Sequence, residues 1–311
     1  MSGKSFRMRL PATSANLGSG FDTAAVALDF FLEIEAEAAD EFSIEASGTD
    51  REICSRLENN LIVETYRRVL NEQGARVQPV AIEMRNHIPL GMGCGSSAAG
   101  RLAAIAMAAH FGNLNWSSDR ILEEGCALEG HPDNAAACWL GGFVAAAMDG
   151  RRVYAAHVEP PSEWRAIVVY PGEALATSAA RAVLPASYSS EEVVTNLQSI
   201  SMLGLAFAQG RGDLLAMAMR DRIHQPYRSA LCPLLPRLLP LAGRDGIIGV
   251  ALSGAGPAVL VIVRTEAEAE HACELIRCAC GNDQVSLTFI RFQPIGAEQG
   301  IELKASTISG L

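Results

Sequence analysis

A glycine-rich segment between a strand-like run and an alanine-rich run constrains the fold of this 311-residue chain more than any other feature. The segment reads Pro89-Leu90-Gly91-Met92-Gly93-Cys94-Gly95-Ser96-Ser97-Ala98-Ala99. The alternation in residues 80–84 predicts a strand, and the many alanines in residues 98–111 predict a buried helix. Glycines at alternate positions let the backbone approach a ligand closely. Because a helix N-terminus also offers unpaired N–H groups and a positive dipole end, the segment predicts a phosphate-binding loop.

The spacing of the glycines separates this segment from other phosphate-binding motifs. A dinucleotide-binding fingerprint needs G-x-G-x-x-G and a P-loop needs G-x-x-x-x-G-K-[ST], and Gly91, Gly93 and Gly95 match neither. The His-Arg-Asp and Asp-Phe-Gly segments of protein kinases do not occur in the sequence. A tight strand-to-helix turn that binds nothing is the plain alternative, and the segment alone leaves both interpretations open.

Composition and charge narrow the class of protein. The chain is 49% hydrophobic and 19% charged, which is typical of globular domains, and its net charge of −10 disfavours nucleic acid and anionic membranes as partners. No apolar run approaches the roughly 18–20 residues that span a bilayer, and the first ten residues lack a signal-peptide core. The eight cysteines show no disulfide framework. We therefore expect a cytoplasmic protein.

The order of the predicted elements indicates a mixed fold. Strands are expected over residues 24–38, 80–84, 143–148, 164–170, 247–252, 258–263 and 285–292, and helices over residues 59–73, 98–111, 118–128, 191–209 and 266–279. Asp213 is expected to cap a further short helix. The mixture predicts an α+β or α/β fold. A polar turn at residues 149–152 marks the middle of the chain, so we predict domains over residues 1–150 and 151–311.

Three segments together resemble the motifs of the GHMP kinases, a family of small-molecule kinases. The glycine loop resembles their P-x-x-x-G-L-G-S-S-A-A motif, with Cys94 in place of leucine. Residues 11–22 (PATSANLGSGFD) resemble the first motif of the family, and residues 252–257 (LSGAGP) resemble the third. The resemblance covers essentially the whole chain. It implies an α+β, two-domain GHMP kinase fold, with an N-terminal ATP-binding domain like ribosomal protein S5 domain 2, a ferredoxin-like C-terminal domain, and an active site between them.

Further segments resemble the homoserine kinase branch of that family. Residues 129–134 (EGHPDN), 177–181 (TSAAR) and 221–228 (DRIHQPYR) are similar to segments of that branch. The resemblance implies transfer of the ATP γ-phosphate to the side-chain hydroxyl of L-homoserine, a step of threonine biosynthesis. Another GHMP kinase, of the mevalonate or sugar type, is the alternative. A GHMP-fold ligand sensor without turnover is a third, although Ser97 and Glu129 are both present.

The same resemblance implies roles for individual residues. ATP would bind at residues 89–99, and Ser97 and Glu129 would hold Mg²⁺, which prefers hard oxygen ligands. The amino-acid substrate would be bound by Asn16, Asp22, Thr177, Arg181 and Arg228, with the arginines on its carboxylate and Asp22 on its ammonium group. Catalytic positions would be Glu129, His131, Asp133 and Asn134. A homodimer is a further expectation.

The role of a general base is left open by the residue types. Asn134 is expected near the reacting hydroxyl, yet an amide cannot accept a proton at neutral pH. Asp133 is the candidate base, and positioning with electrostatic stabilisation is the alternative. Each residue taken alone also has an explanation that involves no function. An isolated arginine is usually a surface residue, and Asn16-Leu17-Gly18 could simply form a turn.

Overall fold

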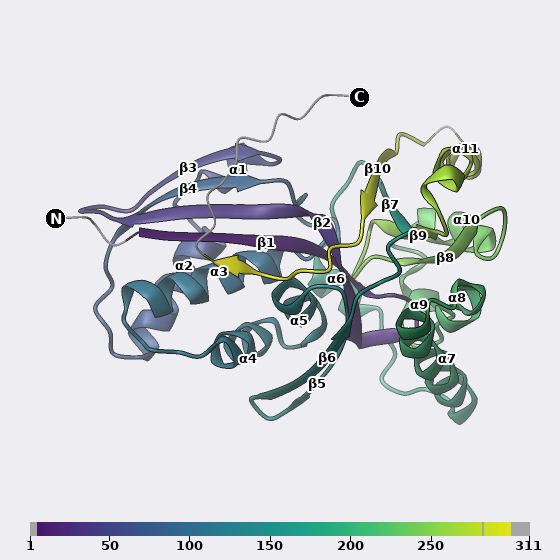
Figure 1. The fold of residues 1–311 in the computed structure, drawn as a ribbon, viewed down its shortest axis with the longest axis horizontal. Helices are drawn as coiled ribbons and strands as arrows, with labels where there is room; N and C mark the ends of the chain where they lie inside the picture. The colour runs from purple at the N-terminus through teal and green to yellow at the C-terminus, as the bar shows by residue number, and fades with distance from the viewer. Residues whose placement is uncertain (1–4, 282, 300–311) are drawn as a thin grey trace.

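The chain folds around two β-sheets that lie side by side along the long axis of the molecule (Figure 1). The computed structural model describes residues 5–281 and 283–299. One sheet has seven strands and the other has four. Within the described residues, no helix is long and apolar enough to cross a membrane.

The seven-stranded sheet is organised around one long hairpin. Its two strands are β1 (Ser5–Asn16) and β2 (Gly20–Ala38), which pair antiparallel along almost their whole length. The other strands are β3 (Ser43–Gly48), β4 (Val80–Asn86), β5 (Phe143–Asp149), β6 (Arg152–Val158) and β11 (Glu298–Gln299). The main order is β11-β1-β2-β4-β3, and the β5–β6 hairpin pairs with the start of β2. The turn between β1 and β2, at residues 17–19, lies beside the second sheet (Figure 1).

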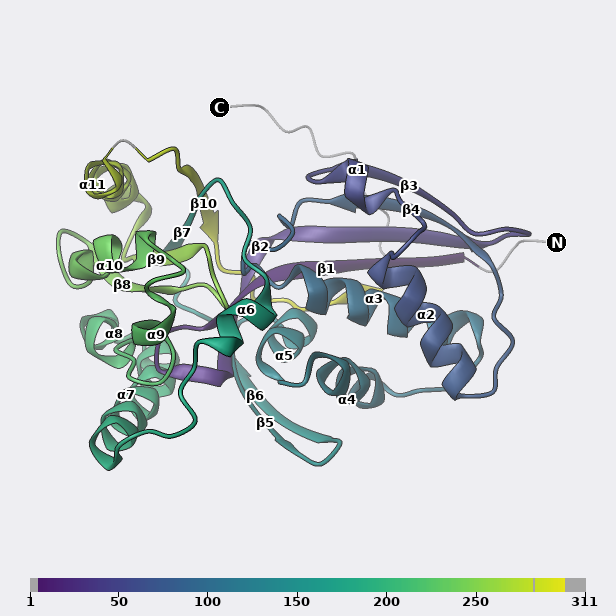
Figure 2. The same ribbon diagram turned by 180° about the vertical axis from the view of Figure 1, so that it is seen from behind.

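Helices cover one face of this sheet, as Figures 1 and 2 show from opposite sides. They are α2 (Leu61–Glu72), α3 (Ser96–Phe111), α4 (Ser118–Glu129) and α5 (Asp133–Leu140), while the short α1 (Arg51–Cys54) lies near β3. Helix α3 is buried almost throughout. Its alanines allow α2, α4 and the sheet to approach it closely, which explains why an alanine-rich helix follows the glycine loop.

The four-stranded sheet has the topology of a ferredoxin-like domain. Its strands are β7 (Arg165–Tyr170), β8 (Ile247–Leu252), β9 (Val259–Val263) and β10 (Ser286–Arg291). All neighbours are antiparallel, in the order β10-β7-β9-β8. The fourth, first, third and second strands of this half therefore lie side by side, as a βαββαβ unit requires.

Six helices and two short 3-10 turns accompany the second sheet. The helices are α6 (Thr177–Ala182), α7 (Ser190–Gln209), α8 (Gly212–Ala218), α9 (Gln225–Arg228), α10 (Leu234–Leu238) and α11 (Ala269–Cys280). The 3-10 turns are η1 (Leu239–Leu241) and η2 (Glu266–Glu268). Helices α6 and α9 are the two that reach the pocket described below.

Most expected elements occur, and the exceptions have local causes. The cap expected at Asp213 is wrong, because Arg211 holds the N-cap position and Asp213 lies in the first turn. There the Asp213 carboxylate accepts hydrogen bonds from the Arg211 guanidinium at 2.7 and 2.8 Å. Residue 150 lies in the turn between β5 and β6, whose strands both belong to the first sheet. The boundary between residues 150 and 151 stays a prediction.

Candidate active site

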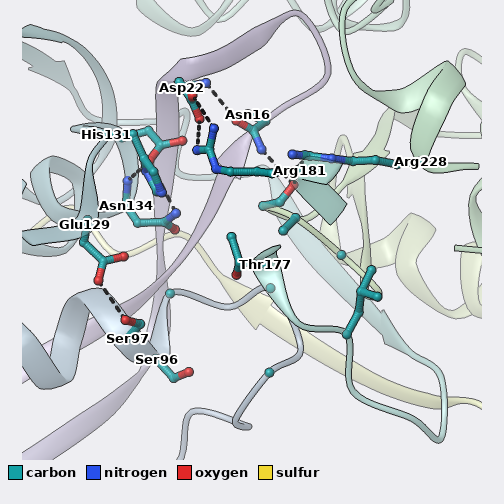
Figure 3. Close-up of a pocket in the computed structure, with 18 of the residues that line it drawn as sticks. Asn16, Asp22, Ser96, Ser97, Glu129, His131, Asn134, Thr177, Arg181 and Arg228 are labelled. Atoms are coloured by element: carbon teal, nitrogen blue, oxygen red, sulfur yellow. Dashed lines mark hydrogen bonds and ion pairs between the residues drawn. The ribbon is translucent and has the colours of Figure 1, made fainter. Parts of the chain in front are cut away.

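A pocket of about 390 Å³ lies between the two sheets and collects the residues singled out from the sequence (Figure 3). Its lining includes Asn16, Asp22, Gly91, Gly93, Gly95, Ser96, Ser97, Glu129, His131, Asp133, Asn134, Thr177, Arg181 and Arg228. Of the other loop residues, Cys94, Ala98 and Ala99 are buried in the core. Pro89 and Met92 are half-buried, and Leu90 lines a neighbouring pocket. Residues more than 200 positions apart thus share one site.

The alternate glycines are required by internal packing as well as by ligand access. Gly91, Gly93 and Gly95 all have left-handed backbone angles, with φ of 68°, 76° and 72°. A Cβ on Gly93 would lie 2.1 Å from the carbonyl oxygen of Ser253, and one on Gly95 would lie 2.0 Å from the Oγ1 of Thr13. Larger side chains therefore cannot occupy these positions without moving either β1 or the 253–256 loop.

Helix α3 begins directly after the loop and is left without a side-chain cap. Gly95 is the N-cap residue and offers no side chain, so the first-turn N–H groups face the pocket. The hydroxyl of Ser97 donates to Oε1 of Glu129 at 2.7 Å. Since Glu129 ends α4, the ends of two helices place a hydroxyl and a carboxylate side by side at the loop (Figure 3).

Arg101 also lines the pocket, and the sequence did not single it out. It lies one turn after Ser97 on α3, and its Nε is 2.7 Å from Oε1 of Glu129. The same Nε lies 3.4 Å from the hydroxyl of Ser97. An i, i+4 relation to Ser97 was the available signal, but only the fold brings Glu129 to the same helix face.

The turn between α4 and α5 arranges three more polar side chains. Gly130 closes α4 with φ of 82°, and α5 starts at Asp133. The buried Asp133 carboxylate contacts Nδ1 of His131 at 2.6 Å and accepts from the backbone N–H of Asn134 at 2.6 Å. The Oδ1 of Asn134 accepts from the hydroxyl of Thr13 at 2.7 Å. Asp133 therefore orients the imidazole and the turn.

The protonation of His131 is set by opposing effects. Burial is the largest single effect and lowers its pKa, but the hydrogen bond and charge of Asp133, with smaller contributions from Asp22 and Glu129, outweigh it. The net result is that the pKa of His131 lies above its usual value. The imidazole faces the pocket next to acidic groups that favour its charged form.

The β1–β2 turn supplies Asn16 and Asp22 in strained backbone conformations. Both have positive φ, 69° and 54°, which is uncommon outside glycine. The side chain of Asn16 accepts from the backbone N–H of Asp22 at 3.0 Å and donates to the carbonyl of Gly254 at 2.7 Å. Asn16 thus ties the first motif to the third across the two sheets.

Arg181 and Asp22 form a two-pronged ion pair at the mouth of the pocket (Figure 3). The Nη1 of Arg181 donates to Oδ2 of Asp22 at 3.0 Å, and Nη2 donates to Oδ1 at 2.7 Å. The hydrogen bond to Asp22 raises the pKa of Arg181 above its usual value against the opposing effect of burial. Thr177, at the start of α6 and exposed, also lines the pocket.

Arg228 is buried to 1% exposure, and two of its three guanidinium nitrogens, Nε and Nη1, have protein partners, which for Nη1 include the carbonyl of Gly254 at 3.4 Å. Its Nε donates to the carbonyl of Ala180 at 3.0 Å, and its Nη1 lies 3.1 Å from Nδ1 of His224. The ring of Phe21 lies 5.3 Å from its guanidinium carbon. No described residue accepts from Nη2, so this nitrogen can donate to an anion in the pocket.

His224 supports Arg228, and the sequence analysis did not assign it a role. A guanidinium can only donate, so Nδ1 of His224 must accept, and Nε2 then carries the proton that is donated to the carbonyl of Gly18 at 2.9 Å. Burial is the main cause of the lowered pKa of His224, and the charge of Arg228 adds to it. The imidazole is neutral and fixed in one tautomer.

The pocket thus has two parts with different components. We call Gly91, Gly93, Gly95, Ser96, Ser97, Arg101 and Glu129 the phosphate half, and Asn16, Asp22, Thr177, Arg181 and Arg228 the acceptor half. A second, more apolar pocket of about 250 Å³ adjoins the phosphate half and shares Ser96 and Ser97 with it. Its other lining residues include Leu32, Ile53, Cys54, Ile62, Met84, Ile88 and Leu90.

Comparison with known proteins agrees with this geometry over most of the chain. Residues 60–142 match the model of the GHMP kinases N terminal domain, and residues 205–282 match that of the GHMP kinases C terminal domain. Homoserine kinase from Solibacter usitatus is 42% identical over 272 residues, which cover 87% of this chain and 88% of the relative. Homoserine kinase from Synechocystis is 36% identical, covering 83% and 86%.

A solved structure extends the match to the fold. The crystal structure of homoserine kinase from Cytophaga hutchinsonii superposes with a TM-score of 0.79, covering 96% of this chain and 98% of that chain at 24% identity. The two sheets, the glycine loop and the pocket between them define a two-domain, ATP-dependent GHMP kinase. The chain belongs to the homoserine kinases of this family. The predicted family and the α+β, two-domain fold class are confirmed.

Proposed function

We propose that this protein transfers the γ-phosphate of ATP to the side-chain hydroxyl of L-homoserine, giving O-phospho-L-homoserine and ADP. The observation that carries the proposal is the pairing of a phosphate half and an acceptor half in one pocket. Phosphoryl transfer depends on positioning and charge stabilisation, and each half of the pocket would bind one of the two substrates.

The acceptor half suits a small zwitterion. Asp22 and Arg181 already form a pair of opposite charges, as an ammonium and a carboxylate would. L-Homoserine can exchange with that pair, its carboxylate binding Arg181 and Nη2 of Arg228 and its ammonium binding Asp22. Mevalonate and sugars have no ammonium group, so they would leave the Asp22 carboxylate without a partner.

The phosphate half suits ATP with a divalent cation. Ser97 and Glu129 offer hard oxygen ligands 2.7 Å apart next to the uncapped start of α3, and this donor set fits Mg²⁺. When bound, Mg²⁺ would supply charge neutralisation at the β- and γ-phosphates. Ser97 and Glu129 would hold it, while the loop N–H groups orient the phosphates.

We assign His131, Asp133 and Asn134 to positioning of the reacting hydroxyl. The Oδ1 of Asp133 is occupied by His131 and the Asn134 backbone, so the carboxylate acts through its neighbours. Replacement of Asp133 by asparagine tests this directly. A residual kcat within about tenfold of wild type supports positioning, whereas a loss of roughly a thousandfold supports a general base.

The apolar second pocket is the place for the nucleotide base. It shares Ser96 and Ser97 with the phosphate half and no lining residue with the acceptor half, so a triphosphate on the loop would direct its base there. Aliphatic side chains on both walls suit a flat aromatic ring. Replacing Ile62 at its wall by tryptophan should raise the KM for ATP and leave the KM for the acceptor unchanged.

The cellular setting follows the same reasoning. All eight cysteines are free, as in a reducing cytoplasm, and the net charge of −10 disfavours nucleic acid as a partner. Helix α7 exposes Val194, Leu197 and Leu205 on the surface to about half of their area, which supports a homodimer. Light scattering on a size-exclusion column tests the dimer, and a monomer mass at micromolar concentration would exclude it.

A coupled ADP-release assay tests the proposed reaction. The panel contains L-homoserine, mevalonate, galactose and L-threonine, each with Mg²⁺ and ATP. We expect acceptor-dependent ADP release with L-homoserine at a rate at least about a hundredfold above the others, because only it presents both charges and a primary hydroxyl. Turnover of another acceptor alone would reassign the substrate, and binding of ATP without any turnover would indicate a sensor.

A further inference from the structure

We infer that Arg101 is a placeholder cation. Its guanidinium neutralises Glu129 before Mg²⁺ and ATP bind, and the side chain then moves so that the guanidinium contacts the phosphates. The inference rests on the proposed function, since it assumes that Ser97 and Glu129 are the metal-binding pair. It adds a residue that neither the motifs nor the proposed roles include.

The contacts of Arg101 coincide with those expected for the metal ion. Its Nε lies 2.7 Å from Oε1 of Glu129 and 3.4 Å from the hydroxyl of Ser97. The hydroxyl of Ser97 donates to that same carboxylate oxygen. Arg101 therefore contacts both proposed ligands of Mg²⁺, and a divalent cation bound to them would compete directly with the guanidinium.

The burial of the pair explains why a placeholder is needed. The side chain of Glu129 is 9% exposed, and that of Arg101 is 25% exposed. A shielded carboxylate without a partner is costly, so it needs a countercharge whenever the metal ion is absent. Arg101 supplies that charge and still keeps one side open to the pocket.

The position of Arg101 on α3 limits where its head group can go after displacement. Its backbone is fixed one turn into the helix, and its side chain lines the same pocket as the loop glycines. A guanidinium repelled from Glu129 by a dication finds its nearest anionic partner in the phosphates, which it binds in a two-pronged geometry. Mg²⁺ and ATP would thus be bound together more tightly than either alone.

A neighbouring ion pair provides a matched control. Arg120 and Glu124 on α4 are also an arginine–glutamate pair, 3.1 Å apart, with side-chain exposures of 33% and 6%, and Arg151 contacts the same carboxylate. None of these residues lines the pocket. Replacing Arg120 by methionine therefore reports what the loss of one arginine contact to a shielded glutamate does to the protein outside the site, with Arg151 still paired to Glu124.

The experiment measures Mn²⁺ binding by electron paramagnetic resonance without nucleotide, and Mg²⁺–ATP binding by calorimetry without an acceptor. The full-length variants are Arg101→Met, Arg101→Lys, Arg120→Met and the double variant Arg101→Met/Glu129→Gln. We expect Arg101→Met to bind Mn²⁺ roughly three- to tenfold more tightly and Mg²⁺–ATP about tenfold more weakly. Arg101→Lys and Arg120→Met should both remain within about threefold of wild type, since each keeps the cation at residue 101.

Three results would overturn the inference. If Mn²⁺ affinity in Arg101→Met equals that of Arg120→Met, or if its gain persists in the double variant, Arg101 does not compete for Glu129. If Mg²⁺–ATP affinity is unchanged, the guanidinium does not reach the phosphates. Neither readout uses homoserine, so failure of the proposed reaction, seen as no homoserine-dependent ADP release by the wild-type protein, is distinguishable from failure of this inference.

Discussion

The phosphate half of the pocket is built largely from backbone and helix ends, whereas the acceptor half is built from side chains of separate segments. Gly93 lies against the backbone of the 253–256 loop and Gly95 against the side chain of Thr13, and the start of α3 supplies N–H groups without a side-chain cap. Asp22 and Arg181, by contrast, meet only through their side chains across 159 positions of sequence. In the proposed function, the first half sets the type of reaction and the second half sets the acceptor.

The charges of the two halves differ in the same way. The phosphate half holds one carboxylate, Glu129, with one arginine beside it. The acceptor half holds two arginines and one carboxylate, with Arg228 kept cationic next to a neutral His224. A substitution in one half should consequently change the kinetics of one substrate and leave the other nearly unaffected.

The largest expected effect is on the phosphate half. Replacing Glu129 by glutamine should lower kcat about a thousandfold, because a metal ligand and a charge partner are lost together. Steady-state ADP release measures this. Glu124→Gln on the same helix is the control, since Glu124 pairs with Arg120 and Arg151 outside the pocket and its variant should keep kcat within about threefold. Equal losses in both variants would show a general effect on folding.

The next effect concerns the stability of the protein when a glycine of the loop is replaced. A Cβ at Gly95 would lie 2.0 Å from the Thr13 hydroxyl, at a φ of 72°. We expect Gly95→Ala to lower the free energy of unfolding by roughly 3 kcal/mol, combining steric overlap with backbone strain. Gly74→Ala has φ of 64° and nothing within 4 Å, so it should lose only about 1 kcal/mol. Urea denaturation compares the two, and similar losses would contradict the packing argument.

Substitutions in the acceptor half should change the kinetics of L-homoserine and leave those of ATP nearly unchanged. Arg181→Met is expected to lower kcat/KM for L-homoserine about a hundredfold, because a two-pronged, charge-assisted contact is removed. The KM for ATP should stay within about threefold. Asp22→Asn should act in the same direction, and the double variant should lose less than the sum of the two, since the residues are partners. Fully additive losses would show that the pair does not act as a unit.

The smallest effect concerns pH. The pKa of His224 is lowered in the folded protein, so below its ordinary value of about 6.5 the unfolded chain binds more protons than the folded one. Stability should then fall with decreasing pH, by at most about 1.4 kcal/mol per pH unit from this group. Comparing urea denaturation at pH 7.5 and 5.5, His224→Gln should show a smaller loss than wild type. The exposed His157→Gln variant is the control and should match wild type.

Local motifs predicted the phosphate half well. The alternation before the loop, the glycines and the alanine run are contiguous, so the strand, the turn and the start of α3 follow from short-range rules. Cys94 in place of leucine is tolerated, because a small thiol packs in the core. Its burial raises the pKa of Cys94 to about 12, so it remains a neutral thiol there.

Long-range contacts limited what could be predicted elsewhere. Asp22 and Arg181 were each expected to bind the substrate, but nothing in their spacing indicates that they pair with each other. Arg101 looks like an ordinary helix cation until α4 brings Glu129 to it. Strand β1 was not predicted, because residues 11–22 were assigned to a motif without a secondary structure, whereas pairing with β2 forms a strand from Ser5 to Asn16. The roles assigned to the site residues stay predictions.

Substrate analogues test most directly the claim that the acceptor half recognises a zwitterion. Wild-type protein and Arg181→Met would be assayed with L-homoserine, 4-hydroxybutyrate, which lacks the ammonium group, and 3-aminopropan-1-ol, which lacks the carboxylate. We expect kcat/KM of the wild type to fall by at least about a hundredfold for each analogue, because a charged group of the pocket is left unpaired. Arg181→Met should discriminate far less between L-homoserine and 3-aminopropan-1-ol. Comparable wild-type kcat/KM values for all three acceptors would contradict the account.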